Sequence, residues 1–387
     1  MTSPIVTRMR GFGTSIFTEM SALALEHGAV NLGQGFPDAD TPEEVKAIAI
    51  KAIGDGVNHY PPARGMPVLR HAVAAHQRRF YALAVDPDDE VLVTVGATEA
   101  LAACVLALVE PGDEVLTFDP TYDAYPAAIA LAGATHRAIP LNLQDHSFDP
   151  TDLSRAVGSR TRMIILNNPH NPSGKVFTAT ELEQIAELAQ DRDLVVVCDE
   201  VYEHLVFDGA QHLPLASLPG MAQRTLTISS GGKTFSATGW KVGWVHGPAP
   251  LVTAVAAVKQ FVTFTGAAAF QPAIAHGLSL PDDFFRELAA DMQRRRDLLM
   301  AALLDIGIEV APTQGSYFVV GDVSAVTTDD ATTWCRALPA TVGVAAIPVA
   351  AFCQDPYDAR NAVRFAFCKE EATLREGIAR LRAGVGR

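Results

Sequence analysis

The sequence predicts an α/β protein with a large domain, a mostly parallel sheet flanked by helices, and a smaller α+β domain. Between residues 91 and 245, short β-branched runs such as 91–95 (VLVTV) alternate with helical patterns. The run 194–198 (LVVVC) is apolar on both faces, which is typical of a central parallel strand. At 387 residues, 49% hydrophobic and 19% charged, the chain is long enough for two cores.

The other elements follow from hydrophobic periodicity and from glycine and proline breaks. Apolar residues at Ile16, Met20, Leu23 and Ala24 predict a short helix that ends near Gly28. Further helices are expected over 42–53, 66–81, 97–109, 249–262, about 283–305 and 371–384, and further strands over 115–118, 162–166, 317–320, 342–347 and 362–367. We therefore expect residues 1–40 to join the small domain, 41–282 to form the large domain and 283–387 to form the small domain.

Polar side chains follow the predicted strands of the large domain. They are Thr98, Tyr122, Asn171, Asp199 and Lys233. In mostly parallel sheets, ligands gather beyond the carboxyl ends of the strands, so these residues predict a site at that edge. The tetrapeptide GGKT at Lys233 also resembles the end of a phosphate-binding P-loop, but that motif requires glycine where Thr227 stands.

An anion site is predicted where strand 91–95 turns at Gly96 into a helix. The amides of Ala97 and Thr98 in the first helical turn suit a phosphate. Ser229, Ser230 and Lys241 could also hold a dianion. The alternative is that Thr98 merely caps the helix of an ordinary turn.

Composition excludes several functions. The 30 basic and 44 acidic residues give a formal charge of −14, which argues against nucleic-acid or anionic-membrane partners. The five cysteines lie far apart without a CxxC pair, so we expect neither disulfides nor a metal site. The sequence contains neither a long apolar run nor a signal-peptide pattern, so we expect a cytoplasmic protein.

From about Phe17 to the last helix, the sequence resembles the fold-type-I aminotransferases that depend on pyridoxal phosphate. The segments that carry the resemblance are LGQGFPD, NNPHNPSGKVF, DEVYEHLVFDG, SSGGKTFSATGWKVGW and VRFAFCK. They are most similar to the kynurenine, glutamine and methionine aminotransferase branch. Within that branch, the segments GVNHYPP, EVLVTVGATEAL and CRALPATVGVAAIPVAAFC are most similar to bacterial N-succinyldiaminopimelate aminotransferases of lysine biosynthesis.

The resemblance implies a role for each predicted cofactor residue. Lys233 matches the lysine that bonds covalently to pyridoxal 5'-phosphate and carries the substrate proton, and Asp199 matches the carboxylate that faces the pyridine nitrogen. Tyr202 and Asn171 match the residues that bond to the ring hydroxyl, and Tyr122 matches the residue that stacks on the ring. The resemblance implies that Tyr202 is catalytic, like Lys233 and Asp199. Ala97, Thr98, Ser230 and Lys241 match the residues that bind the phosphate. Many relatives have arginine at the position of Lys241.

The resemblance also implies substrates and an assembly. Arg364 matches the arginine that binds the α-carboxylate, with Asn171 and the Gly35 backbone nearby and Phe17 in the substrate pocket. Tyr60, a cofactor contact, and Phe264, a substrate contact, match residues contributed by the neighbouring subunit, which implies a homodimer with shared active sites.

The implied reaction is ping-pong transfer of an amino group from an L-amino acid to 2-oxoglutarate, with glutamate as the paired product. Three other functions stay open at this point. The amino donor could be kynurenine, glutamine or methionine, or the chain could be a cysteine-conjugate β-lyase with the same cofactor. A regulatory protein that has lost catalysis is disfavoured by the presence of Lys233, Asp199 and Arg364 and by the acidic charge.

Overall fold

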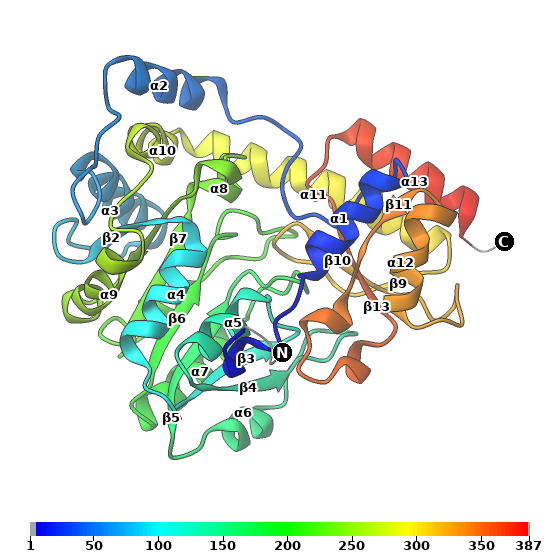
Figure 1. Ribbon diagram of the computed structural model, residues 1–387, viewed down its shortest axis with the longest axis horizontal. Coiled ribbons are helices and arrows are strands. Elements are labelled where there is room, and N and C mark those ends of the chain that lie inside the picture. Colours follow the sequence, from blue (N-terminus) through cyan, green and yellow to red (C-terminus); the bar gives the residue numbers. More distant parts are fainter. Residues whose placement is uncertain (1–4, 386–387) are drawn as a thin grey trace.

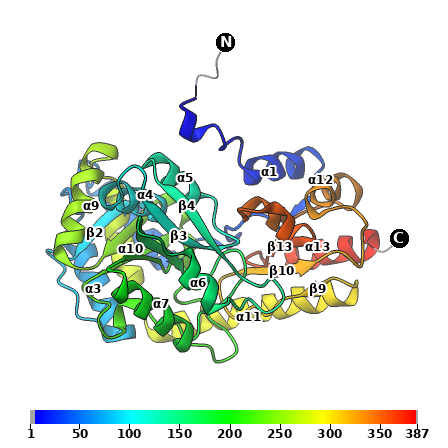
Figure 2. The same cartoon turned by 90° about the horizontal axis from the view of Figure 1, so that it is seen from below.

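The computed structural model describes residues 5–385. Figure 1 shows a larger body around a seven-stranded sheet and a smaller body around a four-stranded sheet. The long helix α11 (Asp282–Asp305) extends from the larger body into the smaller one in both views (Figures 1 and 2). The fold class predicted from the sequence is confirmed. The boundaries at residues 40/41 and 282/283 stay a prediction.

The large sheet has the strand order β2-β8-β7-β6-β5-β3-β4. Its strands are β2 (Val91–Val95), β3 (Glu114–Asp119), β4 (Thr135–Pro140), β5 (Thr161–Asn167), β6 (Val195–Asp199), β7 (Thr225–Ser230) and β8 (Val242–His246). Strand β6 lies at the centre, as its apolar sequence predicts, and the strands from β7 to β4 are parallel. The carboxyl ends of β5, β6 and β7 therefore meet at one edge.

Strand β8 runs antiparallel to both β2 and β7, which the sequence pattern does not indicate. The reason lies in the connection. Only the short helix α8 (Gly231–Thr234) and a 3₁₀ turn (Thr238–Trp240) separate β7 from β8, whereas parallel neighbours need a longer crossover. This tight return keeps Lys233 and Lys241 at the same edge of the sheet.

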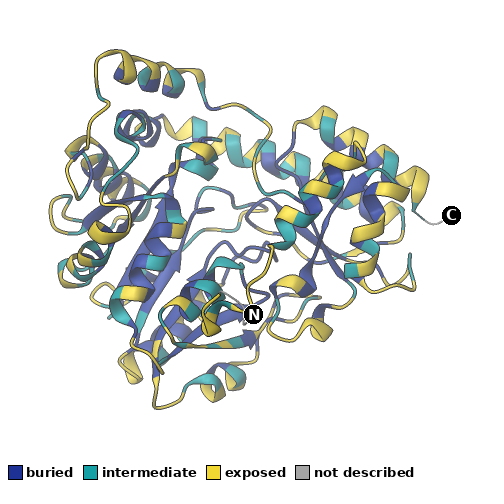
Figure 3. Cartoon of the chain, in the orientation of Figure 1, coloured by how far each residue is buried: buried dark blue, intermediate teal, exposed yellow. Residues whose placement is uncertain are grey.

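Helices cover both faces of the large sheet. Helices α4 (Gly96–Leu108), α5 (Ala124–Leu131) and α9 (Ala249–Val262) pack on one face, and α7 (Ala179–Asp191) packs on the other. Helices α2 (Glu43–Gly54), α3 (Pro67–Tyr81) and α10 (Gln271–Leu278) cover the β2–β8 end. The short helix α6 (Pro150–Ala156) lies beside β4. Figure 3 shows the central strands of the large sheet buried and the exposed residues concentrated on the outer helices.

The smaller body contains an antiparallel sheet of order β12-β13-β10-β9. Its strands are β9 (Glu309–Val310), β10 (Phe318–Asp322), β12 (Ile347–Pro348) and β13 (Ala362–Ala366), and helices α11, α12 (Ala331–Thr341) and α13 (Glu371–Gly384) pack around it. The sequence pattern does not indicate α12, since Pro339 lies inside it and proline normally disfavours a helix interior.

The N-terminal segment reaches the smaller body. Helix α1 (Ile16–Glu26) contacts α12, and β1 (Val30–Asn31) pairs in parallel with β11 (Val344–Ala345). The single strand expected over 342–347 is thus wrong, because Ala346 separates β11 and β12, which join different sheets. Between residues 5 and 385, every helix is too short or too polar to serve as a membrane span.

Candidate active site

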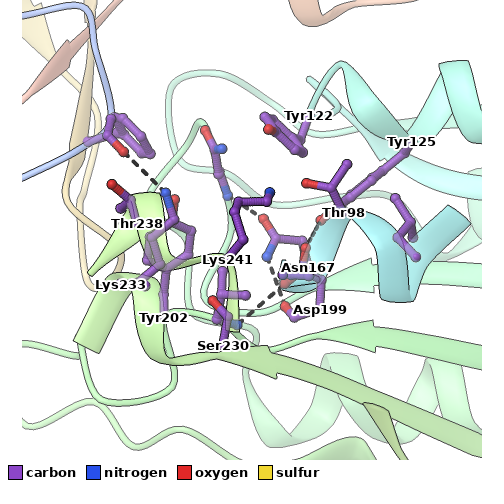
Figure 4. A pocket seen from close by; sticks show the side chains of 18 of the residues that line it. Thr98, Tyr122, Tyr125, Asn167, Asp199, Tyr202, Ser230, Lys233, Thr238 and Lys241 are labelled. Carbon is purple, nitrogen blue, oxygen red and sulfur yellow. Dashed lines mark hydrogen bonds between the residues drawn. The ribbon is translucent and has the colours of Figure 1, made fainter. Parts of the chain in front are cut away.

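A cavity of about 350 Å³ lies at the carboxyl ends of β5, β6 and β7, against the smaller body. Figure 4 shows side chains from β5, β6, β7 and α4 around this space. Most residues predicted for the site line it, and they are Phe17, Gly35, Ala97, Thr98, Tyr122, Asn171, Asp199, Tyr202, Ser230, Lys233, Lys241 and Arg364. Its volume is that of a typical small-molecule site.

Lys233 lies on α8, immediately after β7. The start of α8 passes close to α10, because a Cβ on Gly231 would come within 2.6 Å of Ile274 Cδ1. Lys233 Nζ donates to the Gly35 carbonyl oxygen at 3.1 Å and to the Tyr317 hydroxyl at 2.9 Å. Desolvation by the surrounding protein lowers the pKa of Lys233 to about 8, so a useful fraction of the amine is neutral near neutral pH.

Asp199 is the last residue of β6 and is 7% exposed. The Tyr125 hydroxyl donates to its Oδ2 at 2.7 Å, and the Val201 amide donates to its Oδ1 at 3.3 Å. Burial raises the pKa of Asp199, and the bond from Tyr125 opposes that rise. A cation that binds beside this carboxylate would favour its ionised form and would itself be stabilised.

The first turn of α4 and Lys241 form an anion cradle. A Cβ on Gly96, whose φ is +76°, would come within 2.9 Å of Lys241 Nζ, so this cation stands beside the helix start. A Cβ on Gly243 would lie 2.5 Å from the Gly96 carbonyl carbon, so Gly243 allows β8 to approach that turn.

The predicted alternative, in which Thr98 caps this helix, is wrong. The helix begins at Gly96, and Val95 holds the N-cap position without a side-chain bond to the first turn. The free amides, the helix dipole and Lys241 together suit a phosphate.

Arg364 lies on β13, between Val320 and Ile347 of the neighbouring strands. Arg364 is only 1% exposed. Its guanidinium donates to neutral oxygens rather than to a carboxylate, namely to Asn171 Oδ1 at 2.9 Å and to the Gly33 carbonyl oxygen at 2.7 Å. Within residues 5–385 its Nε has no partner. Burial lowers the pKa of Arg364 to about 10, which leaves it charged at neutral pH, so the site favours an anionic ligand group.

Aromatic rings enclose the cavity. The Arg364 guanidinium carbon lies 3.9 Å from the centroid of the Phe318 ring and 5.1 Å from that of Phe17. The Tyr122 ring lies 6.5 Å from Phe17, and the Tyr202 ring lies edge-on to Tyr317 at 5.0 Å between centroids. These rings exclude water from the charged groups and so strengthen their electrostatic interactions.

Tyr60 and Phe264 are not among the residues that line the cavity. Their rings instead contact each other at 5.6 Å between centroids, and Tyr60 is 84% exposed. This chain's own cavity is therefore formed without them.

Four residues with clear roles in the geometry are not predicted by the sequence pattern, and they are Tyr125, Asn167, Tyr317 and Phe318. Asn167 stands next to Asp199 in the sheet register, accepts from the Asn171 amide at 2.6 Å and donates to the Asp199 carbonyl at 2.9 Å. Its position at the end of strand 161–167 could have identified it. Phe318 packs so closely on Gly35 that a Cβ there would come within 2.5 Å of its Cζ, a contact that no sequence pattern indicates.

One cavity is surrounded by Lys233 on the short helix α8, the buried Asp199 carboxylate, the anion cradle at α4 and the buried Arg364, whose hydrogen bonds go to neutral oxygens. Such a cavity suits a ligand with anionic groups. Residues 27–381 match the family described as aminotransferase class I and II, and the chain belongs to this family. It is an aminotransferase.

Two curated relatives cover nearly the whole chain. A probable N-succinyldiaminopimelate aminotransferase of Mycobacterium tuberculosis is 51% identical, with 97% of each chain covered. A methionine aminotransferase of Escherichia coli is 39% identical, again with 97% of each chain covered. The solved structure of the M. tuberculosis N-succinyldiaminopimelate aminotransferase matches with a TM-score of 0.95, covering 98% of this chain and 99% of that one. The resemblance seen in the sequence is confirmed.

Proposed function

We propose that this aminotransferase depends on pyridoxal 5'-phosphate and transfers the amino group of N-succinyl-L,L-2,6-diaminopimelate to 2-oxoglutarate by ping-pong kinetics. The observation that carries the proposal is the convergence of Lys233, Asp199, Lys241 and Arg364 on one cavity. The choice of donor rests on the 51% identity to the M. tuberculosis relative. Glutamate and 2-oxoglutarate form the second substrate pair.

The residues present fit the cofactor. The cradle at Gly96 and Gly243 has room only because neither residue carries a Cβ, and Lys241 stands beside it. In this proposal the phosphate is held by the amides of Ala97 and Thr98, the Ser230 hydroxyl and Lys241. Asp199 would be the partner of the ring nitrogen, Tyr202 and Asn171 would hold the ring hydroxyl, and Tyr122 would pack on the ring.

Lys233 and Arg364 act on the substrate. When bound, the cofactor supplies an electron-withdrawing ring that acidifies the Cα–H bond of an attached amino acid. Arg364 binds the α-carboxylate through its fork of N–H donors and so fixes the orientation of that bond. Lys233, with its pKa lowered to about 8, takes and returns the Cα proton.

We also propose that two copies share their active sites, with Tyr60 reaching the cofactor and Phe264 the substrate of the neighbouring copy. The exposure of Tyr60 and its contact with Phe264 support this, because a large exposed aromatic pair is typical of an interface.

Mixing two inactive variants tests the shared sites. Tyr60→Ala damages the neighbour's site, whereas Lys233→Ala damages only its own. Half of the dimers in an equilibrated mixture are hybrids with one intact site, so we expect roughly a quarter of the wild-type activity to return. A mixture no more active than its components would refute shared sites.

The donor is tested by kcat/KM with 2-oxoglutarate as acceptor. We expect N-succinyl-L,L-2,6-diaminopimelate to exceed methionine, kynurenine and glutamine by more than tenfold, or about 1.4 kcal/mol of transition-state binding. If one of the other donors is better, the specific proposal is wrong. If pyruvate and ammonia leave a cysteine conjugate without any oxo acid, the chain is a β-lyase.

A further inference from the structure

Tyr317 is a buried tyrosine whose hydroxyl lies directly beside the amine of Lys233. It is 1% exposed and comes just before β10, in the smaller body. Its hydroxyl accepts from Lys233 Nζ at 2.9 Å and donates to the Gly35 carbonyl oxygen. The same carbonyl accepts from Lys233 Nζ at 3.1 Å, which closes a triangle of three hydrogen-bonded groups.

The hydrogen bonds of this triangle fix the orientation of the neutral Lys233 amine. A neutral lysine has two N–H bonds and one lone pair, and the Gly35 carbonyl and the Tyr317 oxygen accept both N–H bonds. The proton of Tyr317 is committed to Gly35, so Tyr317 does not donate to the lone pair. The lone pair must therefore point along the remaining tetrahedral direction, away from both acceptors.

We propose that Tyr317 is a positioning residue that, with the Gly35 carbonyl, aims the Lys233 lone pair at the substrate Cα–H bond. The inference rests on the proposed function for the identity of that bond. As the Cα–H bond breaks, a new N–H bond forms on Lys233, and the electron pair stays on the substrate side. The resulting ammonium keeps two of its N–H bonds on Tyr317 and Gly35 and presents the third, which is the proton that it returns.

The surrounding packing holds Tyr317 in this position. Its ring lies edge-on to Tyr202 at 5.0 Å and to Phe318 at 4.8 Å between centroids. Phe318 in turn lies under Arg364, with the guanidinium carbon 3.9 Å from its ring centroid. The proposed proton carrier and the proposed carboxylate clamp are thus built on adjacent residues, Tyr317 and Phe318.

The first test measures the pKa of the Lys233 amine and does not depend on catalytic activity. Full-length protein freed of cofactor is labelled with acetic anhydride across a pH range, and the modification of Lys233 is quantified by mass spectrometry. Tyr317→Phe keeps the ring and removes one acceptor. An acceptor stabilises the ammonium more than the neutral amine, so we expect the pKa of Lys233 to fall further in the variant.

Tyr81→Phe is the matched control, since it removes a tyrosine hydroxyl that lies beside Glu203 rather than beside Lys233. We expect the labelling profile of Lys233 in Tyr81→Phe to match the wild type. An unchanged profile in Tyr317→Phe would overturn the inference. This result does not depend on the donor or the cofactor, so it is separable from the proposed function.

The second test uses the loaded enzyme. We expect Tyr317→Phe to lower kcat by about tenfold to a hundredfold and to leave KM within about twofold, because the carboxylate clamp is intact. The isotope effect on kcat with an α-deuterated donor should rise, since proton transfer becomes slower than other steps. A residue that merely supports the fold would instead lower thermal stability or raise KM with an unchanged isotope effect, and that outcome would overturn the inference.

Discussion

The segment from Asp199 to His204 contributes to two buried polar regions that differ in how their groups are paired. Asp199 and Tyr202 line the active-site cavity. Glu200, Glu203 and His204 belong instead to a second region, which we call the histidine cluster and which also includes His76 and His212.

In the histidine cluster, polar side chains bond to one another, and of the fully buried polar atoms of the cluster only Glu203 Oε2 and His212 Nδ1 have no partner within residues 5–385. His212 Nε2 lies 3.0 Å from Glu200 Oε2, His76 Nε2 lies 2.7 Å from His204 Nε2, and the Ser229 hydroxyl donates to Glu203 at 2.8 Å. In the cavity, by contrast, Arg364 and Lys233 bond to neutral oxygens. We interpret the cavity, where the cations of Arg364 and Lys233 bond only to neutral oxygens, as a ligand site, and the Glu200–His212 pair of the histidine cluster as structural support.

The histidine cluster includes three possible metal ligands. One ligand atom each of His76, Glu203 and His204 lies within 4.8 Å of the others. The 2.7 Å between the two ring nitrogens is a hydrogen-bond distance, whereas two nitrogens on one zinc ion are roughly 3.3 Å apart. We therefore interpret this contact as one imidazole donating to the other.

The largest expected difference separates the adjacent acids Asp199 and Glu200. We expect Asp199→Asn to fold normally and to lose roughly 10³-fold or more in kcat/KM, because the amide no longer stabilises a cationic ring nitrogen. Glu200→Gln should lower the unfolding temperature, since it weakens the pair with His212, and should change kcat/KM far less. Near-normal turnover in Asp199→Asn would show that Asp199 is not needed for the reaction.

Arg364→Ala should cost about 2 to 5 kcal/mol of transition-state binding, because the α-carboxylate loses its partner. The loss should be nearly equal for every amino donor, since all carry this carboxylate. Arg364→Lys keeps the charge but not the fork of N–H donors, so we expect partial activity. Kinetics with several donors measure this, and a loss confined to one donor would show that Arg364 binds a side chain instead.

The cavity could be predicted from the sequence, whereas the histidine cluster could not. Asp199, Lys233 and Arg364 follow or occupy predicted strands in recognisable motifs, so the fold and most lining residues could be predicted. Tyr125 could not, because it acts through a bond to Asp199 that depends on how α5 packs. The histidine cluster joins residues as far apart as His76 and His204, and only the packing of α3 against the segment after β6 brings them together.

His76→Ala tests whether the histidine cluster supports the fold rather than catalysis. The change leaves His204 without its buried partner and opens a small cavity, so we expect a loss of about 2 kcal/mol in the free energy of unfolding. Urea denaturation measures this loss. The kcat of the folded variant should stay within about twofold of the wild type, and a much larger fall would connect the cluster to catalysis.

The pH dependence of stability gives a smaller effect. Burial lowers the pKa of His76 from 6.5 to about 3 and that of His246 from 6.5 to about 4. As the pH falls from about 6.5 towards 4, the unfolded chain takes up protons at these residues that the folded chain does not, so stability should fall.

Glu203 opposes this trend. Burial raises its pKa from 4.5 to about 7, so over that range the folded chain holds a proton there that the unfolded chain releases, and stability from this group falls as the pH rises. We expect the histidines to dominate and urea midpoints to decrease from pH 6.5 to pH 4.5. A midpoint that increases on acidification would contradict this balance.

Reduction of the cofactor-loaded protein with borohydride, followed by peptide mapping, tests whether Lys233 is the lysine that bonds to the cofactor. We predict a yellow protein in which reduction fixes the cofactor to the peptide that contains Lys233, and no fixation in Lys233→Ala. Fixation to another lysine, or a wild-type protein that retains no cofactor, would contradict the account of this site.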